Sequence, residues 1–258
     1  MDGLKRLLGY ARRACDEYRM IEDGDRIAVG VSAGKDSLSL LYTLAELRRF
    51  YPKKFELIGI TVDMRFEALG EGRTAADYSP IADLCRELNV EYHVIPSDIA
   101  KIVFDVRKEE NPCSLCAKLR RGMLNDAAKS FGCNKVALGH HFDDAVQTFM
   151  LNLFYEGRIG CFAPVTYLDR TDITVIRPLV FAQEKDIRYF ANHAGLPVVE
   201  STCPANKNTE REEMKQLLAE LEKSNRGLRH RIFGAMQRAG VDGFHESKIR
   251  RYGEPDDE

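Results

Sequence analysis

Apolar residues along the chain follow two different spacings. Short runs rich in Val, Ile, Leu and Ala are bounded by Gly, Asp or Asn, which is typical of strands buried in a sheet. Between them, apolar residues recur every three or four positions, as on one face of an amphipathic helix. The first spacing predicts strands at residues 27–31, 57–62, 91–95, 135–138 and 174–176. The second predicts helices at residues 3–20, 38–47, 79–89, 115–131, 145–155, 184–193, 209–222 and 226–238.

This alternation of strands and helices indicates an α/β fold. We expect a Rossmann-like, mostly parallel sheet of about five strands, with helices on both faces and a helical C-terminal extension. The pattern loosens over residues 157–171, where we expect a loop or flap. The predicted units are an N-terminal helix (1–24), an α/β domain with an inserted Cys-x-x-Cys helix (25–200), the C-terminal helical extension (201–253) and a disordered acidic tail (254–258).

The composition is that of an ordinary globular protein, with 44% hydrophobic and 30% charged residues among 258. No stretch approaches the roughly 18 apolar residues of a membrane span, and the N-terminal segment is charged throughout. We therefore expect no membrane span and a cytoplasmic location. A net charge of −2 does not by itself indicate a nucleic-acid partner. Seven cysteines without an export signal favour reduced thiols, metal ligation or catalysis over disulfides.

The first predicted strand runs directly into the loop Ser-Ala-Gly-Lys-Asp-Ser, residues 32–37, and then into a helix. Small residues, successive backbone N–H groups and a helix N-terminus together form an anion site, to which Lys35 adds a full charge. A Walker A loop is excluded because Asp36 follows the lysine and Val29 stands where its first glycine belongs. Gly30 and Gly34 also lack the spacing of a dinucleotide-binding fingerprint.

Acidic residues follow two other predicted strands. Asp63 ends the strand at 57–62, and Gly139, His140, Asp143 and Asp144 follow the strand at 135–138. In an open α/β sheet, ligands bind beyond the carboxyl ends of the strands where the strand order reverses, so we expect these groups beside the 32–37 loop. The carboxylates suit magnesium and phosphate binding, with Asp144 as a candidate magnesium ligand. The alternative is that they only cap turns and helices.

Three cysteines stand outside the apolar stripes. Cys113 and Cys116 form a Cys-x-x-Cys pair at the entry to a predicted helix, and Cys203 lies in a loop before a proline. The pair fits either a redox couple or one half of a metal site. Basic residues follow the pair, and others lie in the last predicted helix, as expected where a polyanion binds. They are Lys118, Arg120, Arg121, Arg229 and Arg231.

The loop at 32–37 resembles the pyrophosphatase loop, Ser-Gly-Gly-Lys-Asp-Ser, of the adenosine-nucleotide α-hydrolases, which cleave ATP to AMP and pyrophosphate. It departs from that pattern at Ala33. Across residues 1–240 the chain resembles the tRNA 2-thiocytidine synthetases, on the motifs GHHFDDAVQTFMLNLFYEG, VIRPL and EKDI and on the order of the three cysteines. The resemblance implies nucleotide binding by Ser32, Ala33, Gly34, Lys35, Asp36, Ser37, Asp63, Gly139 and His140, with Asp143 and Asp144 also at the catalytic centre.

The resemblance further implies a 4Fe-4S cluster held by Cys113, Cys116 and Cys203. Three thiolates leave one iron without a protein ligand. Cys133 and Cys161 are candidates for a fourth ligand.

The implied reaction is ATP-dependent and uses magnesium. The C2 oxygen of a tRNA cytidine is adenylated and then replaced by sulfur. Implied partners are the tRNA, a sulfur donor such as a cysteine desulfurase or free sulfide, and a second copy of the chain. The alternatives are a 2-thiouridine or lysidine type of enzyme, a cluster-dependent desulfidase that needs no ATP, and an ATP-binding module without turnover.

Overall fold

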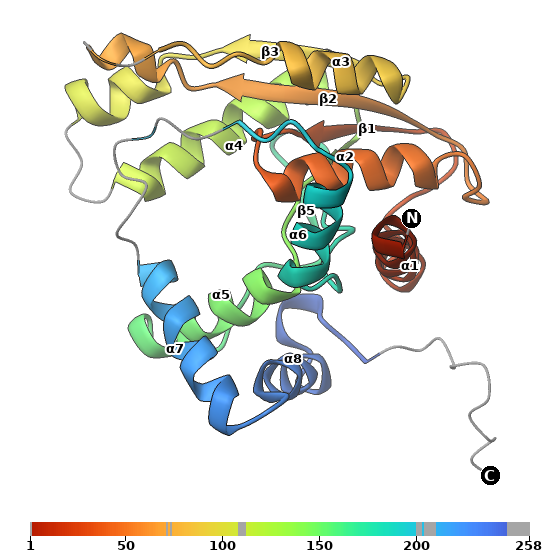
Figure 1. Ribbon diagram of the computed structural model, residues 1–258, viewed down its shortest axis with the longest axis vertical. Coiled ribbons are helices and arrows are strands. Elements are labelled where there is room, and N and C mark those ends of the chain that lie inside the picture. The colour runs from red at the N-terminus through yellow and green to blue at the C-terminus, as the bar shows by residue number, and fades with distance from the viewer. Residues whose placement is uncertain are drawn as a thin grey trace.

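The computed structural model describes residues 2–70, 72, 74–107, 112–199, 203 and 210–246, and its centre is a single six-stranded sheet (Figure 1). The strand order is β3-β2-β1-β4-β6-β5, and all neighbouring strands are parallel except β5 and β6. The predicted acidic tail lies outside the described residues. The strands are β1 (Asp25–Gly30), β2 (Phe55–Asp63), β3 (Glu91–Pro96), β4 (Lys135–Ala137), β5 (Val165–Leu168) and β6 (Ile173–Ile176).

Eight α-helices accompany these strands in the described parts of the chain. None of them is both long and apolar enough to cross a lipid bilayer. Short helical turns also occur at Phe66–Leu69, Lys101–Val106 and Val241–Gly243. The helices are α1 (Asp2–Glu17), α2 (Lys35–Leu47), α3 (Ser79–Glu87), α4 (Pro112–Ser130), α5 (Phe142–Tyr155), α6 (Glu184–His193), α7 (Glu210–Ser224) and α8 (Leu228–Arg238).

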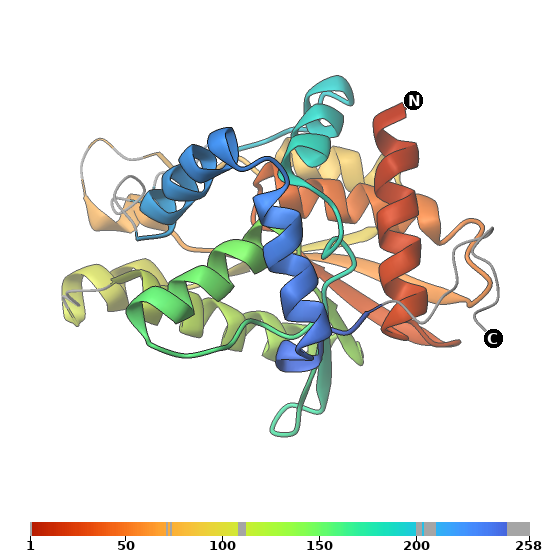
Figure 2. The ribbon, with the colours of Figure 1, turned by 90° about the horizontal axis from the view of Figure 1, so that it is seen from below.

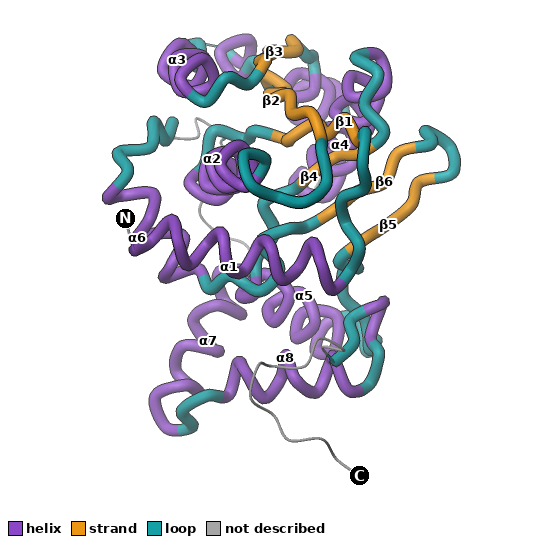
Figure 3. The backbone as a smooth tube through the Cα atoms, turned by 90° about the vertical axis from the view of Figure 1, so that its right-hand side faces the viewer, coloured by secondary structure: helices purple, strands orange, loops and turns teal. Residues whose placement is uncertain are grey.

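The helices form layers on both faces of the sheet, as a buried parallel sheet requires. Side chains of α1, α2, α3 and α6 join one hydrophobic core with Ile27 and Val29 of β1. Leu124 and Ala128 of α4 join the opposite core with Ala28 of the same strand. The three helices α5, α7 and α8 pack on one another at the end of the molecule away from β2 and β3 (Figures 2 and 3).

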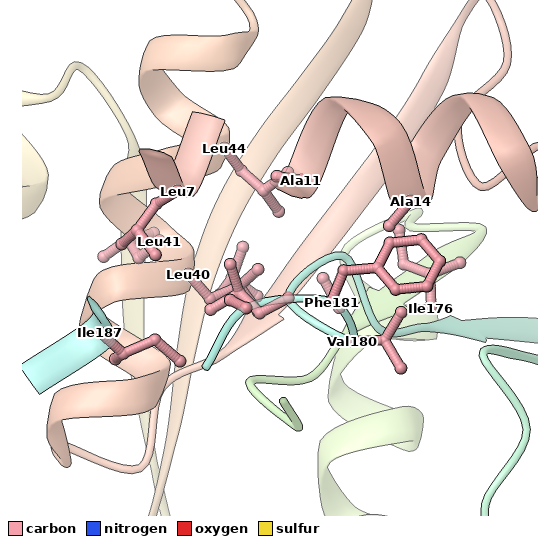
Figure 4. Close-up of a cluster of buried hydrophobic side chains, with 14 of the residues drawn as sticks. Leu7, Ala11, Ala14, Leu40, Leu41, Leu44, Ile176, Val180, Phe181 and Ile187 are labelled. Atoms are coloured by element: carbon pink, nitrogen blue, oxygen red, sulfur yellow. The ribbon is translucent and has the colours of Figure 1, made fainter. Parts of the chain in front are cut away.

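The N-terminal helix packs into the main core. Leu7 and Ala11 of α1 are fully buried, and they lie beside Leu41 and Leu44 of α2 (Figure 4). Each fully buried leucine side chain stabilises the fold by about 2 kcal/mol relative to an exposed one. The apolar stripe predicted for residues 3–20 therefore fastens α1 over the helix that follows the 32–37 loop.

The predicted fold class, the five predicted strands and the eight predicted helices are confirmed, with shifted ends. The prediction of a loop over residues 157–171 was wrong in one respect, because β5 forms there and pairs antiparallel with β6. This strand is short and lies at the sheet edge, where Tyr167 is exposed, so it carries neither a continuous apolar run nor a full alternation. Its signal is therefore weak in the sequence.

The strand order places the loop after β1 beside the loop after β4. The chain moves from β1 outwards to β2 and β3, and then returns across to β4 on the other side of β1. Val29 of β1 pairs with Ala137 of β4, so the two strands end at the same edge of the sheet. This is the reversal of strand order at which ligands bind in open α/β sheets, and the expected meeting of residues 32–37 with residues 140–144 is confirmed.

Candidate functional site

The 32–37 loop is held in shape by its own hydrogen bonds. The Ser37 hydroxyl donates to the Gly34 carbonyl oxygen at 3.0 Å and accepts from the Ser32 backbone N–H, also at 3.0 Å. The first turn of α2 closes as the Leu38 N–H donates to the same Gly34 oxygen at 3.1 Å. Helix α2 begins at Lys35, inside the motif, so the positive end of its dipole faces this edge of the sheet.

Ala33 takes the left-handed backbone conformation, with φ of 64°. An alanine there costs roughly 1–2 kcal/mol relative to a right-handed conformation, a cost that glycine largely escapes. Ala33 is buried, and its carbonyl oxygen accepts a hydrogen bond at 3.0 Å from the N–H of Val199, in the extended segment after α6. The loop thus keeps a glycine-type geometry without the glycine, held by a contact from a distant segment.

Gly139 brings the turn after β4 against the first turn of α2. A Cβ atom on this residue would lie 3.0 Å from both the carbonyl carbon and the oxygen of Asp36. Such a contact involves backbone atoms that cannot move aside, so only glycine permits this approach. The two halves of the predicted site are therefore in direct contact.

Both carboxylates of the α5 first turn have partners within the protein. Asp144 accepts from the His141 backbone N–H at 3.0 Å, as a helix cap, and from Arg211 of α7 at 3.2 Å. Asp143 accepts from the Glu184 backbone N–H at 2.7 Å and from Arg229 of α8 at 2.8 Å. Asp144 therefore caps the N-terminus of α5, as the alternative interpretation predicted. Asp143 links the starts of α5 and α6 to α8.

Lys35 lies between two carboxylates, and the sequence analysis identified only one of them. Its ammonium group is 3.0 Å from both oxygens of Asp36 and 3.3 Å from Glu184. Burial alone would lower the pKa of Lys35, but the charges of Asp36 and Glu184 outweigh it and raise that pKa. The lysine is therefore fully charged at neutral pH. The signal for Glu184 was the EKDI motif, which the sequence analysis used only for the resemblance.

Asp63 lies at the carboxyl end of β2, beside β1. One of its oxygens accepts from the Arg65 backbone N–H at 3.1 Å and from the Tyr78 hydroxyl at 3.2 Å. Its position at the sheet edge is as predicted, and its hydrogen bonds are those of a turn cap.

His140 lies in a positively charged, partly buried environment. Its ring packs on Phe162 with a centroid separation of 4.9 Å, and its buried Nδ1 atom has no hydrogen-bond partner among the described residues. Burial, and then the charge of Arg177, lower the pKa of His140 to about 3, so the imidazole is neutral at physiological pH. Burial also lowers the pKa of Arg177 to about 10. Arg177 and Arg211 were missed by the sequence analysis because only the fold brings them to this edge.

The three predicted thiol ligands are grouped near the start of α4. Cys113 is exposed, while Cys116 and Cys203 are partly exposed. Burial raises the pKa of Cys116, Arg120 opposes this, and the thiols of Cys203 and Cys113 raise it further, so both of these thiols lie near Cys116. In the described part of the chain, no three His, Cys, Asp or Glu side chains have the spacing of a formed metal site.

The two candidates for a fourth ligand lie elsewhere. Cys133 is buried immediately before β4, at the amino edge of the sheet, close to Arg26. Cys161 donates a hydrogen bond to the Ala145 carbonyl oxygen at 3.4 Å, and burial raises its pKa to about 12. Both thiols are thus protonated and placed away from the start of α4.

The predicted basic residues divide into two groups. Lys118, Arg120 and Arg121 are exposed on α4, next to the thiols. In the other group, Arg229 is paired with Asp143, and Arg231 hydrogen-bonds to the Arg226 carbonyl oxygen at 3.0 Å. The basic residues of α4 are therefore the group whose positive charge is more available to a ligand.

Comparison with known proteins identifies the family. The PP-loop domain family matches residues 10–233. The tRNA-cytidine(32) 2-sulfurtransferase of Geobacter sulfurreducens is 40% identical over 235 residues, covering 90% of this chain and 89% of that protein. Its counterpart in Syntrophotalea carbinolica is 36% identical, covering 97% and 94%.

A solved structure agrees with these relatives. The U34-tRNA thiolase NcsA from Methanococcus maripaludis, with its 4Fe-4S cluster, superposes with a TM-score of 0.72 and 26% identity, covering 90% of this chain and 77% of that one. The 32–37 loop lies at the edge of the sheet where the sequence predicted it, and the relatives match nearly the whole length of the chain. The chain belongs to the PP-loop family and, within it, to the tRNA-cytidine 2-sulfurtransferase enzymes.

Proposed function

We propose that this enzyme uses ATP and magnesium to replace the C2 oxygen of a tRNA cytidine, at position 32 as in its relatives, by sulfur. One observation carries the proposal: the 32–37 loop and the start of α4, which carries two of the thiols, lie at the same edge of the sheet. Leu124 of α4 packs over Gly30 at the end of β1, and Cys116 precedes it by about two helical turns, or roughly 12 Å. Two successive steps can therefore act on one substrate.

In the first step ATP binds at the carboxyl edge. The backbone N–H groups of residues 32–37 and the ammonium group of Lys35 hold the β,γ-phosphates and stabilise the pyrophosphate as it leaves. Asp63, Gly139 and His140 line the nucleoside side of the same edge. Asp36, Asp143 and Asp144 are acidic groups at the same edge, and Asp144 is the candidate magnesium ligand once Arg211 turns to the phosphates.

The cytidine C2 oxygen attacks the α-phosphorus, and the bond to pyrophosphate breaks. Sulfide then adds at C2, the carbon–oxygen bond breaks, and AMP leaves. The phosphate loop lowers the barrier of the first step because it places positive charge where negative charge develops.

Cys113, Cys116 and Cys203 fit a 4Fe-4S cluster because they are at least partly exposed and two of them lie near Cys116, whereas the other cysteines are hydrogen-bonded or buried elsewhere. When bound by three thiolates, such a cluster supplies an iron site open to sulfide. Arg120 acts to lower the pKa of Cys116 and so favours the thiolate that ligation needs.

The tRNA binds along α4 in this proposal. Lys118, Arg120 and Arg121 contact backbone phosphates, with Arg231 as a more distant contact, while Arg229 contributes by holding Asp143. The target base turns out of its loop to reach the edge of the sheet. We further propose a cytoplasmic enzyme that takes its sulfur from a cysteine desulfurase or from free sulfide and pairs as a homodimer.

The test is anaerobic purification followed by measurement of iron, acid-labile sulfide and absorbance, and then a thiolation assay on unmodified tRNA. We expect an absorbance band near 400 nm and 2-thiocytidine formation that requires ATP and releases AMP. Iron-free protein that still thiolates tRNA would contradict the cluster. Release of sulfur from a thiolated base without ATP would identify a desulfidase instead, and modification of uridine would identify a 2-thiouridine enzyme.

A further inference from the structure

Glu184, the first residue of α6, has a side chain surrounded by three cations. Its carboxylate lies 3.3 Å from Lys35 of the phosphate loop, 3.0 Å from Lys215 of α7, and 2.9 Å from Arg188 of its own helix. The side chain is only 12% exposed. Burial alone would raise the pKa of Glu184, but the bond from Lys215 and the charge of Lys35 outweigh it and lower that pKa to about 2. The carboxylate is therefore charged throughout the physiological range.

The three cations share the two oxygens of this one carboxylate unevenly. Lys35, Arg188 and Lys215 all approach Oε1, and Lys215 also reaches Oε2. The three cations repel one another, so removing one relieves that repulsion and strengthens the net attraction of the carboxylate for the other two. Two of the three belong to different parts of the site: Lys35 to the nucleotide loop and Lys215 to α7.

The main chain of Glu184 is fixed independently of its side chain. Its N–H donates to Asp143 at 2.7 Å, and Asp143 in turn accepts from Arg229 of α8. If Lys35 leaves, the carboxylate consequently stays where it is and remains bonded to α7. A triphosphate can remove Lys35, because charge-assisted bonds to several phosphate oxygens are stronger than a shared bond to one carboxylate oxygen.

We propose that Glu184 is a positioning residue that couples occupancy of the phosphate loop to the docking of α7. It holds Lys35 while the loop is empty, and it holds Lys215 more tightly once ATP has taken Lys35. This inference rests on the proposed function, since it takes ATP as the ligand of the loop. Helix α7 follows Cys203 in the chain.

The test is hydrogen exchange of the full chain, with and without ATP and magnesium and without tRNA, followed over peptides that cover α7. We expect ATP to slow exchange in α7 by about threefold or more in the wild type. In Glu184→Gln, which keeps the size and removes the charge, exchange in α7 should be faster without ATP and should no longer respond to it.

Calorimetry provides a readout that a merely structural role of Glu184 would not change. The Glu184→Gln variant should bind ATP several-fold more tightly, because the phosphates no longer compete with this carboxylate for Lys35. The matched control is Lys215→Gln. It should lose the α7 response in the same way but should not bind ATP more tightly than the wild type, since the contact between Lys35 and Glu184 remains.

The outcomes separate this inference from the proposed function. If ATP binds to the wild type but exchange in α7 does not change, or if Glu184→Gln retains the full response, the coupling is wrong and the proposed function stands. Weaker ATP binding in Glu184→Gln with an intact fold would also overturn it. If the wild type does not bind ATP, the proposed function and the coupling fall together.

Discussion

The phosphate loop and the thiol site lie at the same edge of the sheet, but they are built in different ways. The loop is a run of six consecutive residues, closed by hydrogen bonds between Ser32, Gly34 and Ser37 and continued directly by a strand and a helix. The thiol site combines the first turn of α4 with Cys203, which follows α6 in the chain. The loop is therefore shaped mainly by neighbours in sequence, with one added bond from Val199, whereas the thiol site depends on the packing of distant segments.

This difference implies that the two regions can be disabled separately. The hydrogen bonds of Ser32, Gly34 and Ser37 lie within the loop and Val199 adds one from outside, whereas Cys203 reaches the two thiols of α4 from a segment distant in sequence. Changes in the loop should leave iron binding intact, and changes in the thiols should leave ATP binding intact. Single substitutions at each site test this separation.

The largest effect is expected from Lys35→Ala. Without the ammonium group the charge of the departing pyrophosphate is not neutralised, so tRNA-dependent AMP release should fall by at least about 100-fold. The iron content and visible absorbance should remain those of the wild type, because Lys35 contacts only Asp36 and Glu184 among the described residues. AMP release at a near-normal rate would contradict the role given to the loop.

The reverse result is expected from Cys203→Ala. Iron should be lost because two thiolates cannot hold the cluster, while calorimetric ATP binding should stay within about twofold of the wild type, since a neutral change far along the chain leaves the loop intact. The matched control is Cys161→Ala, whose thiol bonds to Ala145 and should be dispensable for iron. Iron retained in the first variant, or lost in the second, would mean that the ligand set is different.

A smaller effect concerns the pH dependence of stability near the loop. His140 has a pKa of about 3 when folded, so it stays neutral, while in the unfolded chain it takes up a proton below its ordinary pKa of 6.5. Its contribution to stability is thus present above pH 6.5 and is lost as the pH falls towards 3. The difference in unfolding free energy between the wild type and His140→Gln should shrink by about 1 kcal/mol from pH 7.5 to 5.5.

Urea unfolding of both proteins at the two pH values measures this change. A difference that is the same at pH 7.5 and 5.5 would show that His140 is hydrated and titrates normally in the folded protein. Phe162→Leu offers a related control, because it removes the ring against which His140 packs. It should reduce the change in unfolding free energy between pH 7.5 and 5.5.

The smallest effect is expected from Ala33→Gly. Glycine relieves the left-handed conformation but makes the unfolded chain more flexible, so the net gain should be about 0.5–1 kcal/mol. Urea unfolding measures it, and the control Ala28→Gly, in β1 where no positive φ is needed, should be destabilising. A loss of stability in Ala33→Gly would mean that the buried methyl group matters more than the backbone strain.

Most of the fold could be predicted from the sequence because the central strands are buried on both faces and so read as apolar runs. The edge strand β5 could not, since it pairs on one side only and exposes Tyr167. The starts of two helices also differ from their predicted positions. Helix α4 begins at Pro112 and α5 at Phe142, so Cys113, Asp143 and Asp144 lie within first turns instead of before them.

The candidate site divides in the same way. The phosphate loop and the Cys-x-x-Cys pair were evident from the sequence because their residues are adjacent and their spacing carries the chemistry. Glu184, Arg177 and Arg211 were not found, because each acts through a partner that is distant in sequence. A charged residue in an amphipathic helix has the same local signal whether it is solvated or paired across the molecule.

The α/β class could be predicted from the sequence alone, and the 32–37 loop and the three cysteines could be selected as candidates, because these depend on local spacing and on residue type. Only the tertiary structure decided that Gly139 touches the backbone of Asp36, that Val199 holds Ala33 in a left-handed conformation, and that one carboxylate is shared by Lys35 and Lys215. Those contacts join segments that packing alone brings together, and their strength depends on the burial that packing creates.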